Sequence, residues 1–130
     1  MDGGADRLAR AFVDAITTKD RDGLMSVFDP QIDFRGLTPN YEWRATTPEE
    51  VAEVVLGNWF EPTDHVREVV EVRVEPFADR HHLSYRMRVE NDDGMHVVEQ
   101  QSFLDAADGR ITRMSVVCSG FRHVEDAPER

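Results

Sequence analysis

Two polar side chains stand two residues apart in a segment that otherwise has the pattern of an apolar strand face. Glu99 and Gln101 lie between Val97 and Phe103 in one series of alternate positions, and alternate residues of a strand share a face of the sheet. A buried carboxyl group is costly without partners and favours its protonated form, which suits a general acid or base. If this face of the strand lines a pocket, Glu99 is the candidate for proton exchange with a substrate and Gln101 the candidate donor to a substrate carbonyl. The alternative is a Glu–Gln pair that neighbouring side chains satisfy, or that lies exposed at a rim.

Aromatic residues around the third predicted helix are candidates for the mouth of a pocket. They are Tyr41, Trp43, Trp59 and Phe60. Tyr41 is the best candidate for a hydrogen-bonding role, because its hydroxyl could orient a polar ligand. The alternative is that these rings belong to an ordinary core.

Cys118 is the single cysteine of the chain, so the fold does not rely on an internal disulfide. As a nucleophile its thiol would need a nearby base or positive charge, and Arg122 and His123 are close in sequence. A small buried core residue is the alternative that the pattern favours. The five histidines lack the i, i+4 spacing of a helical zinc site, and no glycine-rich loop could hold a phosphate. We therefore expect neither a metal nor a cofactor.

The composition indicates one domain with an excess of acidic residues. The 130 residues carry a formal net charge of −11, and 40% of them are hydrophobic, which is enough for one core at this length. An acidic chain repels nucleic-acid phosphates and anionic membrane surfaces. No apolar run approaches the ~18 residues of a membrane span, and the first residues lack the pattern of a signal peptide. We expect a cytoplasmic protein without nucleic-acid or membrane partners.

The helical spacing of apolar residues predicts three helices in the first half of the chain. They span about residues 6–19, 24–28 and 47–59. Thr47 caps the third helix, because proline follows it and a glutamate stands three residues after the cap. Residues 31–37 alternate as a strand, and we expect a loop between this strand and the third helix.

Alternating apolar residues predict four strands after the third helix. They span about residues 66–77, 80–90, 95–104 and 111–121. Turn signals between them, Asn91-Asp92-Asp93-Gly94 and Ala107-Asp108-Gly109, are typical of hairpins. This order predicts an α+β fold with helices on one face of an antiparallel sheet. We expect a flexible N-terminus over 1–5, one domain over 6–122 and a polar tail over 123–130.

Three local phrases carry a resemblance to known proteins. They are Asp20-Arg21-Asp22-Gly23 through Phe28, Trp43-Arg44, and Asp108-Gly109-Arg110-Ile111 leading to Met114. With the order of elements, they resemble the nuclear-transport-factor-2-like superfamily, which includes ketosteroid isomerase, SnoaL-like polyketide cyclases and limonene-epoxide-hydrolase-like enzymes. The resemblance implies a cone in which three N-terminal helices pack on a curved, mostly antiparallel β-sheet around a pocket, and a homodimer formed through the outer sheet face. This fold hosts enzymes and non-enzymes alike, so it leaves the reaction open.

The resemblance also tests individual residues. Counted from Gly23 and Phe28, the place of the isomerase's oxyanion-hole tyrosine holds Phe12, and its base falls near Phe34 to Gly36. Counted back from Gly109, its second acid falls on Gln101, which would put Gln101 and Glu99 on the pocket side. None of the three functional side chains is kept, so the sequence argues against steroid isomerase chemistry.

Two functions of different classes remain. The first is a SnoaL-like protein that binds a small apolar oxygenated molecule in a cone-shaped pocket and is open to acid–base isomerase, cyclase or hydrolase chemistry. Its catalytic residues would be Glu99, Gln101 and Tyr41. The pocket walls would be Phe12, Phe34, Trp43, Trp59, Tyr85, Phe103, Met114 and Cys118. The second is a non-catalytic ligand-binding or dimerisation module of the same fold, in which Glu99 and Gln101 are satisfied internally.

Overall fold

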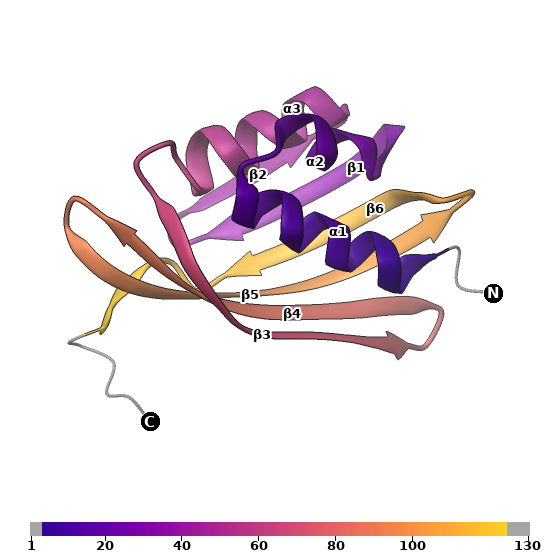
Figure 1. Cartoon of the computed structure of the whole chain (residues 1–130). Coiled ribbons are helices and arrows are strands. Elements are labelled where there is room, and N and C mark those ends of the chain that lie inside the picture. The colour runs from indigo at the N-terminus through magenta and orange to yellow at the C-terminus, as the bar shows by residue number, and fades with distance from the viewer. Residues whose placement is uncertain (1–3, 125–130) are drawn as a thin grey trace.

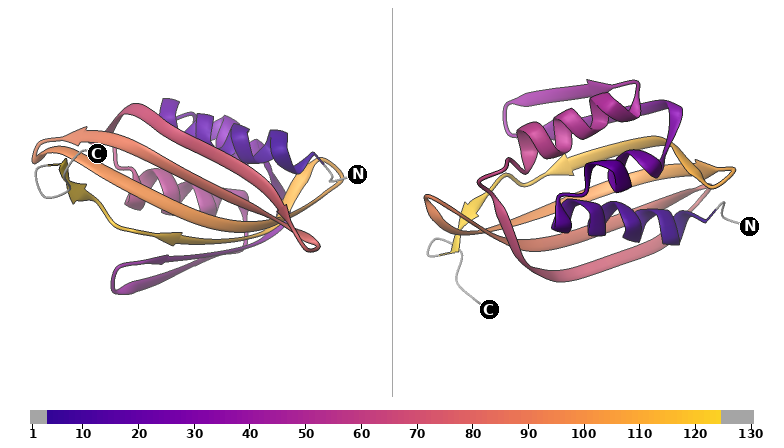
Figure 2. Two further views of the ribbon diagram at one scale, coloured as in Figure 1. Left: turned by 90° about the horizontal axis from the view of Figure 1, so that it is seen from below. Right: turned by 45° about the horizontal axis from the view of Figure 1, so that its top comes forward.

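The computed structural model describes residues 4–124, in which helices pack on one face of a curved sheet (Figures 1 and 2). The helices are α1 (Ala5–Thr18), α2 (Arg21–Ser26), α3 (Pro48–Ala52) and the π-helix η1 (Glu53–Trp59). The strands are β1 (Phe28–Thr38), β2 (Tyr41–Ala45), β3 (His65–Phe77), β4 (Arg80–Asn91), β5 (Gly94–Ala107), β6 (Arg110–Cys118) and β7 (Arg122–His123). The predicted tail beyond Val124 lies outside the described residues.

The strands form one mixed sheet in the order β2-β1-β6-β5-β4-β3, and β7 pairs with β5. The β1–β6 pair is parallel, whereas β3, β4, β5 and β6 follow one another as antiparallel neighbours. Helices α1 and α2 precede the sheet, and α3 with η1 follows its first two strands. The expectation of helices on one face of a curved, mostly antiparallel sheet is therefore confirmed.

The ends of the helices follow from local hydrogen bonds. Asp20 caps α2 by accepting the backbone N–H of Gly23 at 3.0 Å, and Thr47 caps α3 by accepting that of Glu50 at 3.1 Å. The backbone N–H and hydroxyl of Thr46 both donate to the Glu50 carboxylate, and these bonds lower the pKa of Glu50. The signals that predicted the third helix therefore form its cap.

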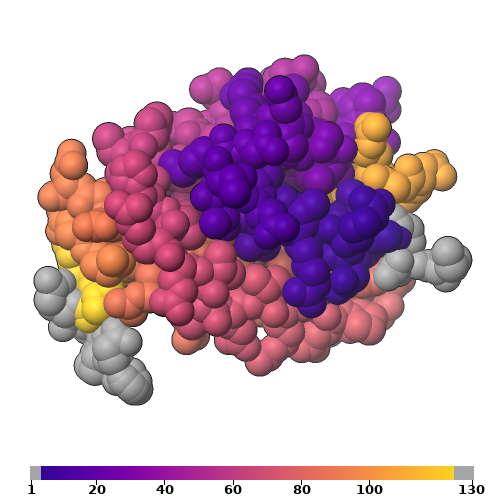
Figure 3. All heavy atoms as spheres, viewed as in Figure 1, coloured from indigo at the N-terminus to yellow at the C-terminus, as the bar shows by residue number. Residues whose placement is uncertain are grey.

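The core is a chain of aromatic rings between the helices and the sheet. The ring of Phe12 on α1 lies 6.0 Å from that of Phe28 and 6.2 Å from that of Tyr85. The ring of Phe34 lies 6.3 Å from Phe28 and 5.8 Å from Trp59. Burying such large rings is the main favourable term in folding. Figure 3 shows α1 and α2 covering this core from the helix side.

Two short strands were missed by the sequence reading. Residues 41–45, expected as a loop, form β2, which pairs with β1 through a tight turn in which Asn40 has a φ of 70°. Strand β2 is an edge strand, so only Ala45 is buried and the apolar pattern is weak. After β6 ends at Cys118, the chain turns at Gly120, which has a φ of 80°. It then pairs with β5 as strand β7, opposite His96 and Val97.

The predicted face of β5 is wrong by one residue. The side chains that point into the core are His96, Val98, Gln100, Ser102 and Leu104. Glu99 and Gln101, with Val97 and Phe103, lie on the outer face instead. The count from Gly109 crosses a bulge between the β5–β6 pairs at Asp105 and Ala106, and a shift of one residue exchanges the two faces of a strand.

Candidate functional site

A row of three polar side chains crosses the inner face of the sheet. Tyr85 on β4 is the register partner of Gln100 on β5, and Gln100 is the partner of Cys118 on β6. The Tyr85 hydroxyl donates to Oε1 of Gln100. Tyr85 and Gln100 are buried, whereas Cys118 is partly exposed and packs against the core. A phenol, a carboxamide and a thiol therefore lie side by side under the helices.

Burial keeps the Tyr85 phenol neutral. The loss of solvent raises its pKa well above the ordinary value of 10.0, and the negative charge that Cys118 would carry adds to the effect. The neutral phenol keeps the O–H group that donates the hydrogen bond to Oε1 of Gln100. The row therefore presents hydrogen-bond donors without a net charge.

Four buried side-chain polar atoms have no hydrogen-bond partner within the described part of the chain. They are Nε2 of Gln100, Oγ of Ser102, Nε1 of Trp59 and Nδ1 of His96. Gln100 and Ser102 are 0% exposed, and Trp59 is 7% exposed. Most buried polar groups in proteins are paired, so such a cluster is a signal that requires an explanation.

Trp59 lies over strand β1. A Cβ atom added to Gly36 would lie 2.4 Å from the Trp59 ring, so the indole rests directly on the Gly36 backbone. Gly36 pairs with Val116 on β6, and Val116 pairs with Ser102 on β5. Gln100 and Ser102 thus belong to two adjacent rows of the inner face, and Trp59 lies over the β1 end of the row that contains Ser102.

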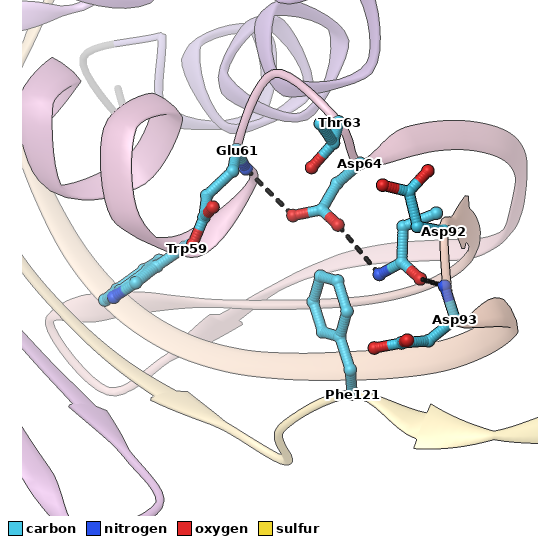
Figure 4. Close-up of a pocket in the computed structure, with 8 residues that line it drawn as sticks. Trp59, Glu61, Thr63, Asp64, Asp92, Asp93 and Phe121 are labelled. Atoms are coloured by element: carbon cyan, nitrogen blue, oxygen red, sulfur yellow. Dashed lines mark hydrogen bonds between the residues drawn. The ribbon is translucent and has the colours of Figure 1, made fainter.

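Trp59 also lines a pocket of about 490 Å³ near the β4–β5 turn, at one end of the sheet (Figure 4). Asp64, 7% exposed, accepts the backbone N–H of Glu61 at 2.9 Å and the side-chain amide of Asn91 at 2.9 Å. Phe121 forms a further wall of this pocket. Because Trp59 reaches both the pocket and the core, we call this pocket the mouth of the site.

A lysine stands behind the mouth. Nζ of Lys19 donates to the backbone carbonyls of Phe60 at 3.2 Å and Glu61 at 2.6 Å. Partial burial lowers the pKa of Lys19, and the Asp64 carboxylate opposes this by raising it. Lys19 therefore ties the end of α1 to the end of η1 and fixes the segment that carries Trp59.

The predicted acid Glu99 forms an outer hydrogen-bond network. Its carboxylate accepts from Arg86 at 2.6 Å and from Gln101 at 2.7 Å, and Gln101 also contacts His82 at 2.7 Å. The Glu99 carboxylate raises the pKa of Arg86. These residues border a depression of about 310 Å³ on the outer sheet face. Glu99 and Gln101 are brought together as expected, but away from the core.

Two other predicted site residues also lie outside the core. Tyr41 is 59% exposed at the β1–β2 hairpin, where its ring centroid lies 4.4 Å from that of Trp43 and the two rings are tilted by 60°. Phe103, expected as a pocket wall, lies on the outer face with its ring 4.9 Å from that of His82 and 5.3 Å from that of Phe77. The expected position of Phe103 is wrong for the same reason as that of Glu99.

The other expected walls lie on the inner side. Phe12, Phe34, Trp59, Tyr85 and Met114 are buried, and Trp43 and Cys118 are partly buried against the core. Val116 of β6 is buried next to Met114 in the same series. The structure thus places most of the expected walls on the inner side and the expected polar pair on the outer side, and the role of these residues as pocket walls stays a prediction.

Gln100 and Ser102 were not predicted as inward-facing, although one turn signal in the sequence indicates their orientation. Asn91 pairs with Gly94 across the β4–β5 turn, as the sequence Asn91-Asp92-Asp93-Gly94 suggests for a two-residue loop. Counting outward from that turn pairs Tyr85 with Gln100. Since Tyr85 belongs to the apolar series of β4, this count would have placed Gln100 on the inner face.

No protein-family model and no curated protein matches the sequence. Solved structures do match. A proposed isomerase from Bacillus subtilis superposes with a TM-score of 0.73 at 15% identity, covering 88% of this chain and 85% of that one. A proposed polyketide cyclase from Silicibacter sp. superposes with a TM-score of 0.69 at 17% identity, covering 88% of each.

A third structure names the fold. A protein with a ketosteroid-isomerase-like fold from Catenulispora acidiphila, in complex with trimethylamine, superposes with a TM-score of 0.65 at 12% identity and covers 84% of this chain and 82% of that one. The chain therefore has the nuclear-transport-factor-2-like fold, as the resemblance implied. At these identities the likeness shows the fold alone.

Two further findings concern metal ions and membranes. Within residues 4–124, no group of three or more His, Cys, Asp or Glu side chains is arranged to hold a metal ion. None of the described helices is long and apolar enough to cross a membrane.

Proposed function

We propose that the protein binds a small, mainly apolar molecule with a hydrogen-bond-accepting oxygen inside the cone. The observation that carries the proposal is the set of buried donors of Gln100, Ser102 and Trp59 that lack a partner within residues 4–124. Aromatic and aliphatic walls surround them, and such a lining with a few placed polar groups is typical of ligand pockets. The mouth next to Trp59 offers the route of entry.

The free-energy cost of burying donors without partners favours an oxygen-bearing ligand. Each buried donor without a partner costs about 1–3 kcal/mol. A ligand oxygen that accepts from Nε2 of Gln100 removes part of this cost, whereas a hydrocarbon of the same shape leaves it in place. The site should therefore prefer a carbonyl compound to the matching alkene.

Binding is better supported than acid–base catalysis. Among the described residues, the buried polar and charged side chains are Asp64, His96, Gln100 and Ser102, and Asp64 is hydrogen-bonded at the mouth. Glu99 is paired with Arg86 on the outer face, which is what the non-catalytic alternative expects. Catalytic roles for Glu99, Gln101 and Tyr41 remain predictions, and binding in the cone does not depend on them.

A matched pair of probes tests the proposal. Cyclohexanone and methylenecyclohexane differ in a C=O against a C=CH₂ group, and their dissociation constants can be measured by ligand-observed NMR. One hydrogen bond of about 1 kcal/mol predicts an about fivefold preference for the ketone. Gln100→Leu should abolish the preference, and Gln101→Leu on the outer face should keep it. Equal affinity of the wild-type protein for both probes would overturn the proposal.

We also propose that a second copy of the chain covers the outer sheet face. Leu37 and Val117 are register partners on this face and are 51% and 54% exposed. Large exposed aliphatic side chains that adjoin one another favour an interface. The proposal agrees with the homodimer that the resemblance implies, and a cytoplasmic location likewise remains a prediction.

A further inference from the structure

We propose that Cys118 captures α,β-unsaturated carbonyl compounds covalently, with the carbonyl oxygen held by the side-chain amide of Gln100. The inference rests on the proposed function, since the ligand must enter the cone, and it specifies the class of ligand. The juxtaposition that carries it is the Tyr85–Gln100–Cys118 row on the inner face.

The thiol lies at the end of β6, close in sequence to a wall of the mouth. Cys118 is the last residue of β6 and stands in the same alternating series as the buried Met114 and Val116. It is partly exposed while it packs against the core. Cys118 lies three residues before Phe121, which lines the mouth.

Gln100 supplies the donor for the carbonyl oxygen. Its Oε1 is occupied by the Tyr85 hydroxyl on the β4 side. Because Oε1 is taken by Tyr85, the N–H groups of Nε2 are left for another acceptor on the inner face, where Cys118 is the β6 register partner of Gln100. Nε2 makes no hydrogen bond to any described residue. The amide is thus oriented by Tyr85 and keeps its N–H groups for a ligand.

A backbone donor contacts the sulfur. The N–H of Gly120 points at Sγ of Cys118 at 3.4 Å, and Gly120 holds this position with a φ of 80°, which other residues rarely adopt. Donors therefore stand at both ends of the reacting system: Gly120 at the sulfur and Gln100 at the oxygen.

The proposed step is a conjugate addition that needs no further reactant. The thiol gives its proton to water, and the sulfur lone pair forms a C–S bond to the β-carbon of the ligand. The C=C electron pair moves toward the carbonyl, and the resulting enolate oxygen accepts from Nε2 of Gln100. Water then returns a proton to the α-carbon. The product is a saturated thioether whose mass is the sum of protein and ligand.

The test is the rate at which cyclohex-2-enone adds to the purified chain, measured by intact mass spectrometry against glutathione at the same pH. The expected result is one adduct, absent in Cys118→Ala, that forms at least about tenfold faster than on glutathione. Removing an oxyanion donor slows reactions strongly, so Gln100→Leu should lower the rate about tenfold or more. Gln101→Leu is the matched control and should not change it.

A second reagent separates activation from access. Iodoacetamide alkylates thiols by displacement and forms no enolate, so Gln100→Leu should leave its rate with Cys118 unchanged. An enone rate no faster than that of glutathione, or equal slowing of both reagents in Gln100→Leu, would overturn the inference. The cyclohexanone preference reports on the proposed function separately: its persistence with slow enone addition would leave reversible binding intact and remove covalent capture.

Discussion

The inner face of β5 carries an amide where a carboxylate had been expected, and this difference decides the chemistry of the cone. Gln100 is fully buried and needs no counter-ion, because a carboxamide is neutral. A carboxylate such as Glu99 would require a buried cation in the same place, and it finds Arg86 on the outer face instead. The inner face of β5 therefore carries donors that can hold an oxygen.

Tyr85 gives a pH signature at the residue scale. Because its pKa is raised in the folded state, the stabilisation from the neutral phenol is present below pH about 10 and is lost as the pH rises toward the raised pKa. The free energy of unfolding should fall by up to about 1.4 kcal/mol per pH unit above about 10. Urea unfolding between pH 9 and about 11 measures this slope.

Two variants control for other alkaline effects. Tyr85→Phe should be less stable at neutral pH by about 1–3 kcal/mol, because Oε1 of Gln100 loses its donor, and the extra alkaline slope should vanish. Tyr41→Phe should keep the slope, since Tyr41 is 59% exposed. An identical slope in wild type and Tyr85→Phe would contradict the assignment.

At the scale of elements, the segment after β6 closes the site beside the mouth. The backbone N–H of Ser119 donates to the Glu99 carbonyl at 2.9 Å, and its hydroxyl accepts the Glu99 N–H at 3.0 Å. The Phe121 ring then lies 5.8 Å from those of Phe60 and His96. These contacts hold Phe121, three residues after Cys118, as a wall of the mouth, and we expect this segment to control access to the thiol.

Removing this wall should open the site. Phe121→Ala deletes the ring that packs on Phe60 and His96, so we expect alkylation of Cys118 by iodoacetamide to become several-fold faster. Intact mass spectrometry follows the reaction. Phe77→Ala, which removes an exposed ring of the outer face, should leave the rate unchanged. No acceleration in Phe121→Ala would show that access to Cys118 does not depend on this ring.

At the scale of the whole molecule, charge and apolar surface act against each other. A formal net charge of −11 makes two copies of the chain repel. The outer face nevertheless exposes Leu37 and Val117 side by side, with the ion pairs of Glu71 and Glu99 to Arg73 and Arg86 in the same sheet. Association through this face should therefore be sensitive to salt, because salt screens the repulsion.

Sedimentation equilibrium tests the proposed pairing. The average mass of the wild-type chain should rise toward that of a dimer as salt increases from about 0.02 to about 0.3 M, where the Debye length falls below about 10 Å. Val117→Glu buries a charge in the interface and should remain monomeric throughout. A monomer at every salt concentration in the wild type would argue against the dimer.

Local sequence patterns predict much of the architecture. The Thr47 cap, the stripe through Phe12 and the hairpin at Asn91–Gly94 depend on neighbours in the chain, and each predicted its element. The edge strand β2 could not be found in this way, because a strand with one partner and little buried area leaves only a weak apolar pattern.

The same distinction applies to the residues of the candidate site. The sequence by itself determined the apolar walls, since residues such as Phe34, Trp59 and Met114 are buried by their own hydrophobicity wherever the sheet curves. The pairing of β5 with β4, and not the periodicity of β5 itself, decided which polar pair of β5 faces inward. Both faces of that strand carry polar side chains, so periodicity could not choose between Glu99 with Gln101 and Gln100 with Ser102. The pairing of Tyr85 with Gln100 made the choice, because register partners must share a face.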